Sequence, residues 1–385
     1  MNLRNLFISS SKSINGFRAR LLILAWMAIG LALFDAIINS FFTYPTDPKF
    51  MTPSRLQLYF EYGRSSEGKL ARMTRCDPTQ TAAITLTGWY EPLQVIEPTS
   101  RRQGPVVTFY GMSHAVRLAQ ALDRSTDHLD VRIVGAPGAT GNWSLGAFLR
   151  DRGGDESGVV VLGLMSANLA MIDSVSPMTW NIDGTMPYTA DRFAEGSSGL
   201  TTIAPPYESF EDYCDAFYDP LKWQVVRNRL QKSDPLFSSI IMETNLLDHS
   251  AIIRLLRRAY GQTLVFRARQ SSMSKNGYEA HSEQVKTARA IVQEFAKEAR
   301  IGGMIPIVYL ANNLGYSDYL FQSLEPTLSA ENILYLSSHT IADPSDPRNY
   351  LSDSHFTDEV DDKMARQLER IIEKAVTDLE RRASP

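Results

Sequence analysis

Short apolar runs alternate with amphipathic stretches over residues 105–385. The apolar runs are 7 to 12 residues long and are typical of buried strands: 105–111, 131–138, 158–169, 305–313 and 332–338. The amphipathic stretches have helical spacing: 115–124, 143–152, 282–300 and 357–382. This alternation predicts a mostly parallel sheet with helices on both faces, hence a doubly wound α/β domain. In such domains ligands bind at the carboxyl ends of the strands.

The alternation is interrupted between residues 173 and 280. The first part of this segment is rich in Pro, Gly, Ser and aromatic residues, so we interpret it as an insertion that walls or covers the ligand site. Its aromatic side chains would suit an extended sugar ligand, or else they form a packed core. These residues are Trp180, Tyr188, Phe193, Tyr207 and Phe210.

The N-terminal region contains one long apolar run, residues 21–42. As a helix it would be about 33 Å long, enough to cross a hydrocarbon core of about 30 Å. Residues 1–20 carry Lys and Arg and no acid, which predicts a cytoplasmic N-terminus and an extracytoplasmic remainder. We therefore expect a single-pass protein of the bacterial inner membrane with a periplasmic C-terminal domain. A cleaved signal peptide and a buried helix of a soluble protein are the alternatives.

Asp35 is unusual inside such a run, because a charge in a membrane is costly. Together with Asn39 it either faces a partner helix or lies near the outer interface. Residues 43–104 then form a linker and a membrane-proximal segment, with a helix pair over 56–73 that is broken at Gly63. Cys76 and Cys214 either form a disulfide or are two small buried apolar side chains.

Composition excludes some functions. The net charge is −4 and the basic residues are scattered, so no nucleic-acid partner is expected. The six histidines show no HExxH or similar spacing, and the two cysteines form no CxxC motif. We therefore predict neither a metal site nor a cofactor.

Three strand ends carry candidate chemistry. Ser113 follows the first strand and opens a helix, where its hydroxyl and backbone N–H would lie at the sheet edge. Gly138 lies in the next strand-to-helix turn and could offer an N–H donor. Asn168 follows the third strand and could add a side-chain amide. Taken singly, each has an ordinary alternative: a helix cap, a tight turn and a local turn-former.

Two further candidates precede the last helix. His355 could act as the general base that a serine hydroxyl requires, and Asp353 could orient its ring. His114, beside Ser113, could contact substrate or have a local role at the helix start.

The order and spacing of these residues resemble those of the SGNH (GDSL-type) hydrolases, which have a flavodoxin-like α/β fold. Gly111-Met112-Ser113 stands where that family has Gly-Asp-Ser, and Gly138, Asn168 and the Asp353–His355 pair match its later blocks. The resemblance implies a catalytic set and an oxyanion hole. The catalytic set is Ser113, Asp353 and His355, and the oxyanion hole is formed by Ser113, Gly138 and Asn168.

The sequence also departs from the family pattern. Met112 replaces the acid, Leu169 replaces the Asp that usually follows the Asn, and the last motif is Asp-x-His instead of Asp-x-x-His. The shorter motif is similar to that of SGNH-like acetyltransferases of bacterial polysaccharide modification. We therefore expect a serine esterase or O-acyltransferase acting on acyl esters, such as acetyl, of an extracytoplasmic polysaccharide, with polysaccharide-export proteins as possible partners. The alternatives are a hydrolase of lipids or small esters at the membrane surface and an inactive binding or assembly protein.

Overall fold

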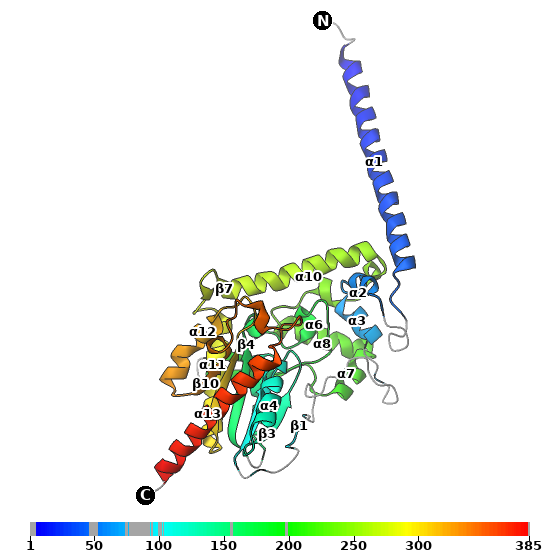
Figure 1. The fold of residues 1–385 in the computed structure, drawn as a ribbon. Coiled ribbons are helices and arrows are strands. Elements are labelled where there is room, and N and C mark those ends of the chain that lie inside the picture. The colour runs from blue at the N-terminus through cyan, green and yellow to red at the C-terminus, as the bar shows by residue number, and fades with distance from the viewer. Residues whose placement is uncertain are drawn as a thin grey trace.

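The structure is a computed structural model that describes residues 5–45, 53–73, 76, 93, 95–98, 102, 104–154, 157–196 and 199–383. A long N-terminal helix projects from an α/β domain and its insertion (Figure 1). The α/β part comprises β1 (Val95–Ile96), β2 (Val106–Gly111), α4 (Ser113–Ser125), β3 (Asp130–Gly135), α5 (Gly141–Asp151), β4 (Ser157–Met165), η1 (Ser166–Met171), α11 (Glu283–Ile301), β9 (Ile305–Ala311), α12 (Tyr319–Ala330), β10 (Leu334–Ser337), η3 (Ser338–Thr340), η4 (Pro347–Asn349) and α13 (Asp358–Ala383).

The remaining elements belong to the N-terminal region and the insertion. They are α1 (Asn5–Phe41), α2 (Arg55–Glu61), α3 (Ser66–Met73), α6 (Pro177–Trp180), β5 (Arg192–Gly196), β6 (Gly199–Ile203), α7 (Phe210–Phe217), α8 (Pro220–Ser233), α9 (Ser239–Met242), η2 (Leu246–His249), α10 (Ala251–Ser272), β7 (Met273–Ser274) and β8 (Gly277–Tyr278). The helix pair predicted over 56–73 is confirmed as α2 and α3.

The main sheet has six strands in the order β1-β3-β2-β4-β9-β10. All neighbouring strands are parallel except the edge strand β1, which runs antiparallel to β3. The predicted mostly parallel sheet is thus confirmed, and its five parallel strands have the order 2-1-3-4-5 of doubly wound flavodoxin-like sheets. The direction in which successive strands are added to the sheet reverses between β2 and β4, so a ligand is expected at the carboxyl ends of these two strands, at this topological switch point.

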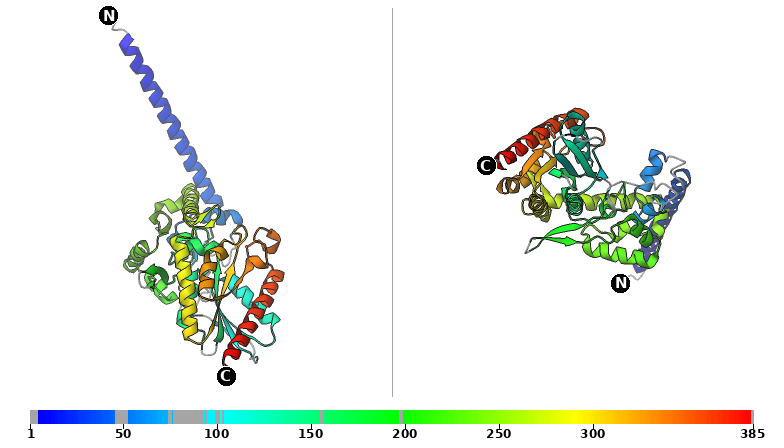
Figure 2. Two further views of the ribbon diagram at one scale, coloured as in Figure 1. Left: turned by 90° about the vertical axis from the view of Figure 1, so that its left-hand side faces the viewer. Right: turned by 90° about the horizontal axis from the view of Figure 1, so that it is seen from below.

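Helices cover both faces of this sheet (Figure 2). One face is covered by α4 and α13, which pack against each other, and the other by α5 and α11. The central strands β2, β4 and β9 are almost continuously buried, as their apolar sequences predict. The strands therefore form a rigid base for the loops at their carboxyl ends.

Helix α1 is the one described helix that is long and apolar enough to cross a membrane, over Gly16–Phe41. It begins at Asn5, earlier than the predicted run 21–42, so Lys12, Arg18 and Arg20 belong to the same helix. Most of its side chains are exposed in the isolated chain, which is consistent with a lipid environment. Residues 1–4 of the predicted cytoplasmic segment lie outside the described residues. So do residues 46–52 and 77–92 of the predicted linker and membrane-proximal segment.

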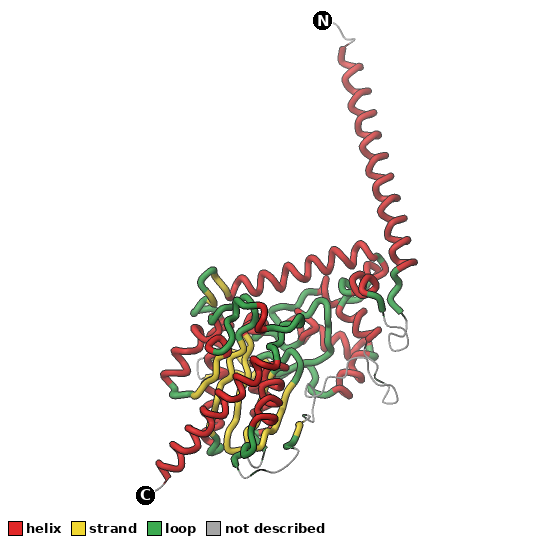
Figure 3. Tube along the Cα trace, in the orientation of Figure 1, coloured by secondary structure: helices red, strands yellow, loops and turns green. Residues whose placement is uncertain are grey.

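The insertion has its own small core, built from residues of α3, α6, α7, α8 and α9. Cys76 and Cys214 form a disulfide beside this core, with their Cα atoms 5.5 Å apart. The expectation that the insertion's aromatic residues present a sugar-binding surface is not supported. Tyr188, Phe193 and Tyr207 are buried because they pack inside the protein. Loop segments lie between the sheet and the long helix at the top of the domain (Figure 3).

Candidate active site

Ser113 is the first residue of α4, directly after the carboxyl end of β2. Helix α4 approaches the sheet closely at this point, because a Cβ on Gly163 would lie only 2.8 Å from the Cβ of Ala115. The backbone there is therefore fixed against the end of β4. The Ser113 side chain is half-buried and lies at the carboxyl end of β2, beside the switch point where a ligand is expected.

The structure brings Ser113 and His355 together across 242 positions of sequence. The Nε2 atom of His355 lies 2.7 Å from Ser113 Oγ, within hydrogen-bond distance. His355 Nδ1 lies 3.0 Å from Asp353 Oδ2. The three side chains thus form a Ser–His–Asp relay with the geometry that activates a serine hydroxyl.

The short Asp-x-His spacing works because of the residue in its middle. Ser354 has a left-handed backbone with φ +70°, which turns the chain sharply between Asp353 and His355. One carboxylate oxygen of Asp353 accepts the backbone N–H of His355 at 3.2 Å, and the other faces the ring. The hydrogen bond from the His355 ring is the main cause that lowers the pKa of the Asp353 carboxyl. Asp353 is therefore ionised near neutral pH, which the 63% exposure of its side chain also favours.

His114 lies beneath this turn and not on an open surface. Its side chain is 4% exposed, and its ring centroid lies 4.8 Å from that of His355. Its Nε2 lies 3.2 Å from the Ser354 carbonyl oxygen. Burial, reinforced by repulsion from His355, lowers the pKa of His114 to about 4. The ring is therefore neutral at pH 7 and donates to Ser354, so the structure favours the local role over substrate contact.

The loop that carries Asp353 and His355 is braced from both sides. Tyr350 pairs with Phe356 in an antiparallel bridge, and the Tyr350 hydroxyl donates to the Asn312 carbonyl at the end of β9. Arg117 of α4 donates to the Phe356 carbonyl and pairs with Asp361 of α13. Burial is the main cause that raises the pKa of Asp361 to about 6, although Arg117 opposes this shift.

The two expected backbone donors of the oxyanion hole are free. Ser113 is the first residue of its helix and Gly138 lies in a turn, and among the described contacts no acceptor is found for either N–H. Gly138 has φ +69°, and a Cβ added there would meet nothing within 4 Å. The turn thus presents its backbone to open space.

Asn168 lies beside Gly138 as expected, but its amide has a different direction. Its Nδ2 donates to the carbonyl oxygens of Gly138 and Ala139, at 3.3 and 3.1 Å. Neither Gly138 nor Asn168 has a described hydrogen bond to Ser113. In this structure Asn168 positions the Gly138 turn, and its predicted role as a direct oxyanion donor stays a prediction.

Sequence reasoning missed the polar residues after β9. The Oδ1 of Asn313 accepts from Ser166 Oγ and from the Ala167 N–H, both at 3.0 Å, and so fixes the start of η1. Ser337 and His339 form a second serine–histidine pair at 2.7 Å, but Ser337 is 2% exposed. The Asn312-Asn313 pair at the end of an apolar run was the available signal. Met112, in the place of the family's acid, is buried in the core.

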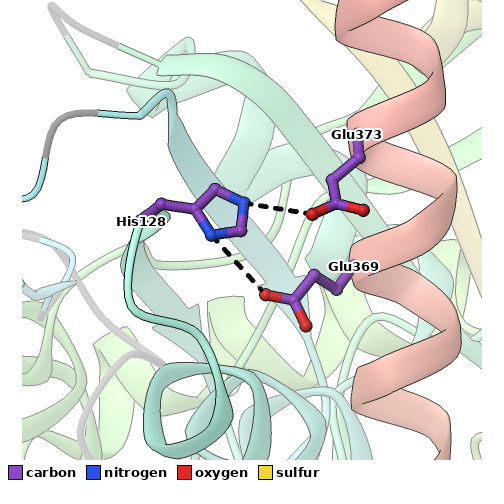
Figure 4. A group of neighbouring side chains, drawn as sticks. All are labelled: His128, Glu369 and Glu373. Atoms are coloured by element: carbon purple, nitrogen blue, oxygen red, sulfur yellow. Dashed lines mark ion pairs between the residues drawn. The ribbon is translucent and has the colours of Figure 1, made fainter.

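Among the residues that the structure describes, one group of side chains could hold a metal ion. His128 lies between two glutamates of α13, with Nδ1 3.9 Å from Glu369 and Nε2 3.5 Å from Glu373 (Figure 4). The His128 Nδ1 also lies 3.1 Å from Asp127. Each ring nitrogen of His128 therefore faces the carboxylate of an acidic residue. The group is about three helical turns along α13 from the end nearest His355.

Comparisons of the chain with models of protein families, with curated proteins and with solved structures find no match.

Proposed function

We propose that this protein is a serine-dependent ester hydrolase or O-acyltransferase. The observation that carries the proposal is the chain of contacts from Ser113 Oγ through His355 to Asp353, at 2.7 and 3.0 Å. A lone serine at a helix start is an ordinary feature, but a serine in line with a histidine that an aspartate orients is typical of nucleophilic acyl transfer. The free N–H groups of Ser113 and Gly138 support the same chemistry.

The proposed reaction proceeds in two halves. Ser113 Oγ attacks the acyl carbonyl carbon while His355 Nε2 takes the hydroxyl proton. The N–H groups of Ser113 and Gly138 stabilise the oxyanion, and a donor of this type contributes about 3 kcal/mol. His355 then protonates the leaving alkoxide, which leaves an acyl-serine. Water or a sugar hydroxyl then gives its proton to His355 and attacks the acyl-serine. His355 returns this proton to Ser113 Oγ as the acyl–oxygen bond breaks, which releases the free acid or the new sugar ester and restores Ser113.

We further propose that the domain is SGNH-like. Two features support this assignment: the strand order, and the placement of Ser113 after β2 and Asn168 after β4, on the two sides of the switch point. The left-handed Ser354 explains how the shorter Asp-x-His motif can still orient His355. Met112, in the place of the family's acid, packs in the hydrophobic core and does not belong to the catalytic set.

For the substrate, we propose acyl esters, such as acetyl, on an extracytoplasmic polysaccharide. The apolar helix α1 and the basic residues before position 21 support a domain held outside the cytoplasm, and the disulfide fits an oxidising compartment. Proteins of a polysaccharide-export system are the proposed partners.

A lipid or small-ester substrate at the membrane surface is the second candidate. Helix α10 lies on the side of the domain from which α1 projects (Figure 1), and it contacts η1, the segment that carries Asn168. This contact favours the second candidate, because it places the site close to the membrane side of the domain. Acetylated xylan tested beside p-nitrophenyl esters of rising chain length separates the two substrate classes. Preference for acetyl on sugar supports the first candidate, and preference for long acyl chains supports the second.

The deciding experiment is labelling of the full-length protein with a fluorophosphonate probe. We expect labelling of the wild type and its loss in Ser113→Ala and His355→Ala. Ser337→Ala is the matched control, because Ser337 also has a histidine partner at 2.7 Å but is buried. If folded wild-type protein is not labelled, the serine mechanism is wrong and an inactive binding protein of the same fold is favoured. If Ser337→Ala alone abolishes labelling, the nucleophile has been assigned to the wrong pair.

A further inference from the structure

The start of helix α10 is attached to the apolar helix α1. Asp35 Oδ1 of α1 accepts from Ser250 Oγ at 3.0 Å and from the Ile252 N–H at 2.9 Å. Asn39 Oδ1 accepts from Arg254 Nη2 at 3.0 Å. Asp35 therefore faces neither a second apolar helix nor open water, but the N-terminus of α10.

This attachment fixes the height of α10 along α1. Asp35 lies six residues before the end of α1 at Phe41, which corresponds to about 9 Å. The last turns of α1 still expose apolar side chains, with Ile37 54% and Phe41 76% exposed. The start of α10 is thus level with residues that favour lipid. If α1 spans a bilayer, the start of α10 lies at its outer interface.

Helix α10 runs across the direction of α1 and is the outermost element on that side of the domain (Figures 1 and 2). Its inner side is buried against the domain at Ala251, Arg254, Arg257 and Gly261. Its outer side exposes large apolar groups: Leu256 (62%), Tyr260 (40%) and Phe266 (57%). Leu246 and Leu247, directly before the helix, are 86% and 51% exposed. Such a surface is costly in water.

The charges of α10 complement its apolar side. The helix contains five arginines and no acidic residue. Arg254 and Arg257 hydrogen-bond to Asp248, whereas Arg267 and Arg269 are exposed and, within the described parts of the chain, pair with no acid. Apolar side chains beside exposed arginines are typical of helices that lie in the plane of a membrane interface and bind anionic headgroups.

We infer that α10 is an interfacial helix, lying flat on the outer surface of the bilayer that α1 crosses. Leu256, Tyr260 and Phe266 enter the boundary between headgroups and acyl chains, and Arg267 and Arg269 bind lipid phosphates. The occupant of this apolar surface is therefore an anionic lipid surface and not another protein. The inference rests on the exposed surface and on the contacts of Asp35 and Asn39, so it holds whether or not Ser113 is a nucleophile.

Depth in the bilayer tests this inference directly. The natural cysteines are paired, so a single added cysteine can carry an environment-sensitive nitrobenzoxadiazole dye. Leu256→Cys reports on α10, and Leu379→Cys is the matched control, because Leu379 is 54% exposed near the C-terminus, far from α1 (Figure 1). Full-length proteins are reconstituted in vesicles of phosphatidylcholine and phosphatidylglycerol. Phe266→Cys provides a second reporter if the first variant folds poorly.

We expect the dye at position 256 to shift its emission to shorter wavelength, to be quenched by nitroxide-labelled lipid and to be protected from iodide. At position 379 we expect no shift, no lipid quenching and full quenching by iodide. If the dye at 256 behaves like the dye at 379, α10 is in water and the inference is wrong. Protection from iodide without quenching by lipid would also overturn it, since a second copy of the chain would then cover the surface.

Discussion

The starts of α4 and α10 satisfy the same chemical requirement in opposite ways. Every helix begins with N–H groups that have no partner in the helix. At α10, Ser250 accepts the Ile253 N–H and Asp35 accepts the Ile252 N–H. At α4, the N-cap is Met112, which makes no side-chain cap, and the Ser113 N–H has no acceptor among the described contacts. In this chain the saturated start of α10 joins two helices, whereas the open start of α4 leaves a backbone donor unused at the candidate site.

Replacement of Ser113 should have the largest effect. In Ser113→Ala we expect a loss of about 10⁶-fold in kcat, as for other serine nucleophiles, with stability changed by less than about 0.5 kcal/mol. The rate should fall because the Ser113 hydroxyl is the proposed nucleophile. The stability should not change because this hydroxyl does not cap helix α4. Turnover of a p-nitrophenyl ester and thermal unfolding in detergent measure the two effects. A stability loss equal to that of a lost cap would break the comparison.

The second prediction concerns pH and His114. Burial lowers the pKa of His114 from 6.5 to about 4, so the folded state resists a proton that the unfolded state binds. The stability from this group is complete above pH 6.5 and is lost as the pH falls toward 4, by about 3 kcal/mol. His114→Gln, which can still donate to Ser354, should remove this slope in the free energy of unfolding.

Asp361 contributes the opposite slope. Because its pKa is raised to about 6, its stabilising contribution is present at low pH and is lost as the pH rises toward 6. Asp361 is present in both proteins, so the difference between wild type and His114→Gln isolates His114. Equal slopes in the two proteins would show that His114 is not buried as a neutral ring.

Gly138 tests the second open donor. In Gly138→Ala the left-handed backbone costs about 1 kcal/mol, and the new methyl group enters the space where the acyl oxygen is expected. We expect this stability loss together with a clear loss of esterase rate. Gly303→Ala is the control, since Gly303 also has positive φ and open space but lies just before β9, at the amino ends of the strands. Equal rates in the two variants would remove Gly138 from the site.

The smallest effect is expected at the capped junction. Asp35→Ala removes the acceptor for the Ile252 N–H and should cost about 1 kcal/mol of stability, with unchanged turnover of a soluble ester. Asp219→Ala removes the cap of α8 and should cost a similar amount. The two variants should differ in the membrane assay, because only Asp35→Ala loosens α10 from α1. Identical dye depth at position 256 in both would contradict this distinction.

The sequence predicted the sheet well and the insertion poorly. The five apolar runs became the five parallel strands because buried strands have near-continuous apolar sequences. The strand predicted over 158–169 is too long, because the observed strand ends at Met165 and Asn168 lies in the short helix η1. Helix α12 was missed, and it contains Pro326. Helix α10 was missed because its arginines interrupt the apolar pattern and several of its large apolar residues point outward.

The candidate site divides in the same way. Asp353 and His355 are two residues apart, so their pairing could be expected from local sequence, although the left-handed Ser354 could not. The contact between Ser113 and His355 depends on the whole sheet, so the residue types suggested it but no local pattern encodes it. The direction of the Asn168 amide depends on the position of a neighbouring turn, which no local pattern encodes.

The disulfide divides the candidate site in terms of covalent connectivity. The bond between Cys76 and Cys214 closes a ring that contains β2, β3 and β4, and therefore Ser113, Gly138 and Asn168. Asp353 and His355 lie outside this ring, on the open C-terminal part of the chain. A single proteolytic cut inside the ring would leave all of these residues on one covalently linked molecule. A cut after residue 214 and before residue 353 would leave the base and its aspartate attached only by non-covalent packing, so the integrity of the site depends on where the chain is cut.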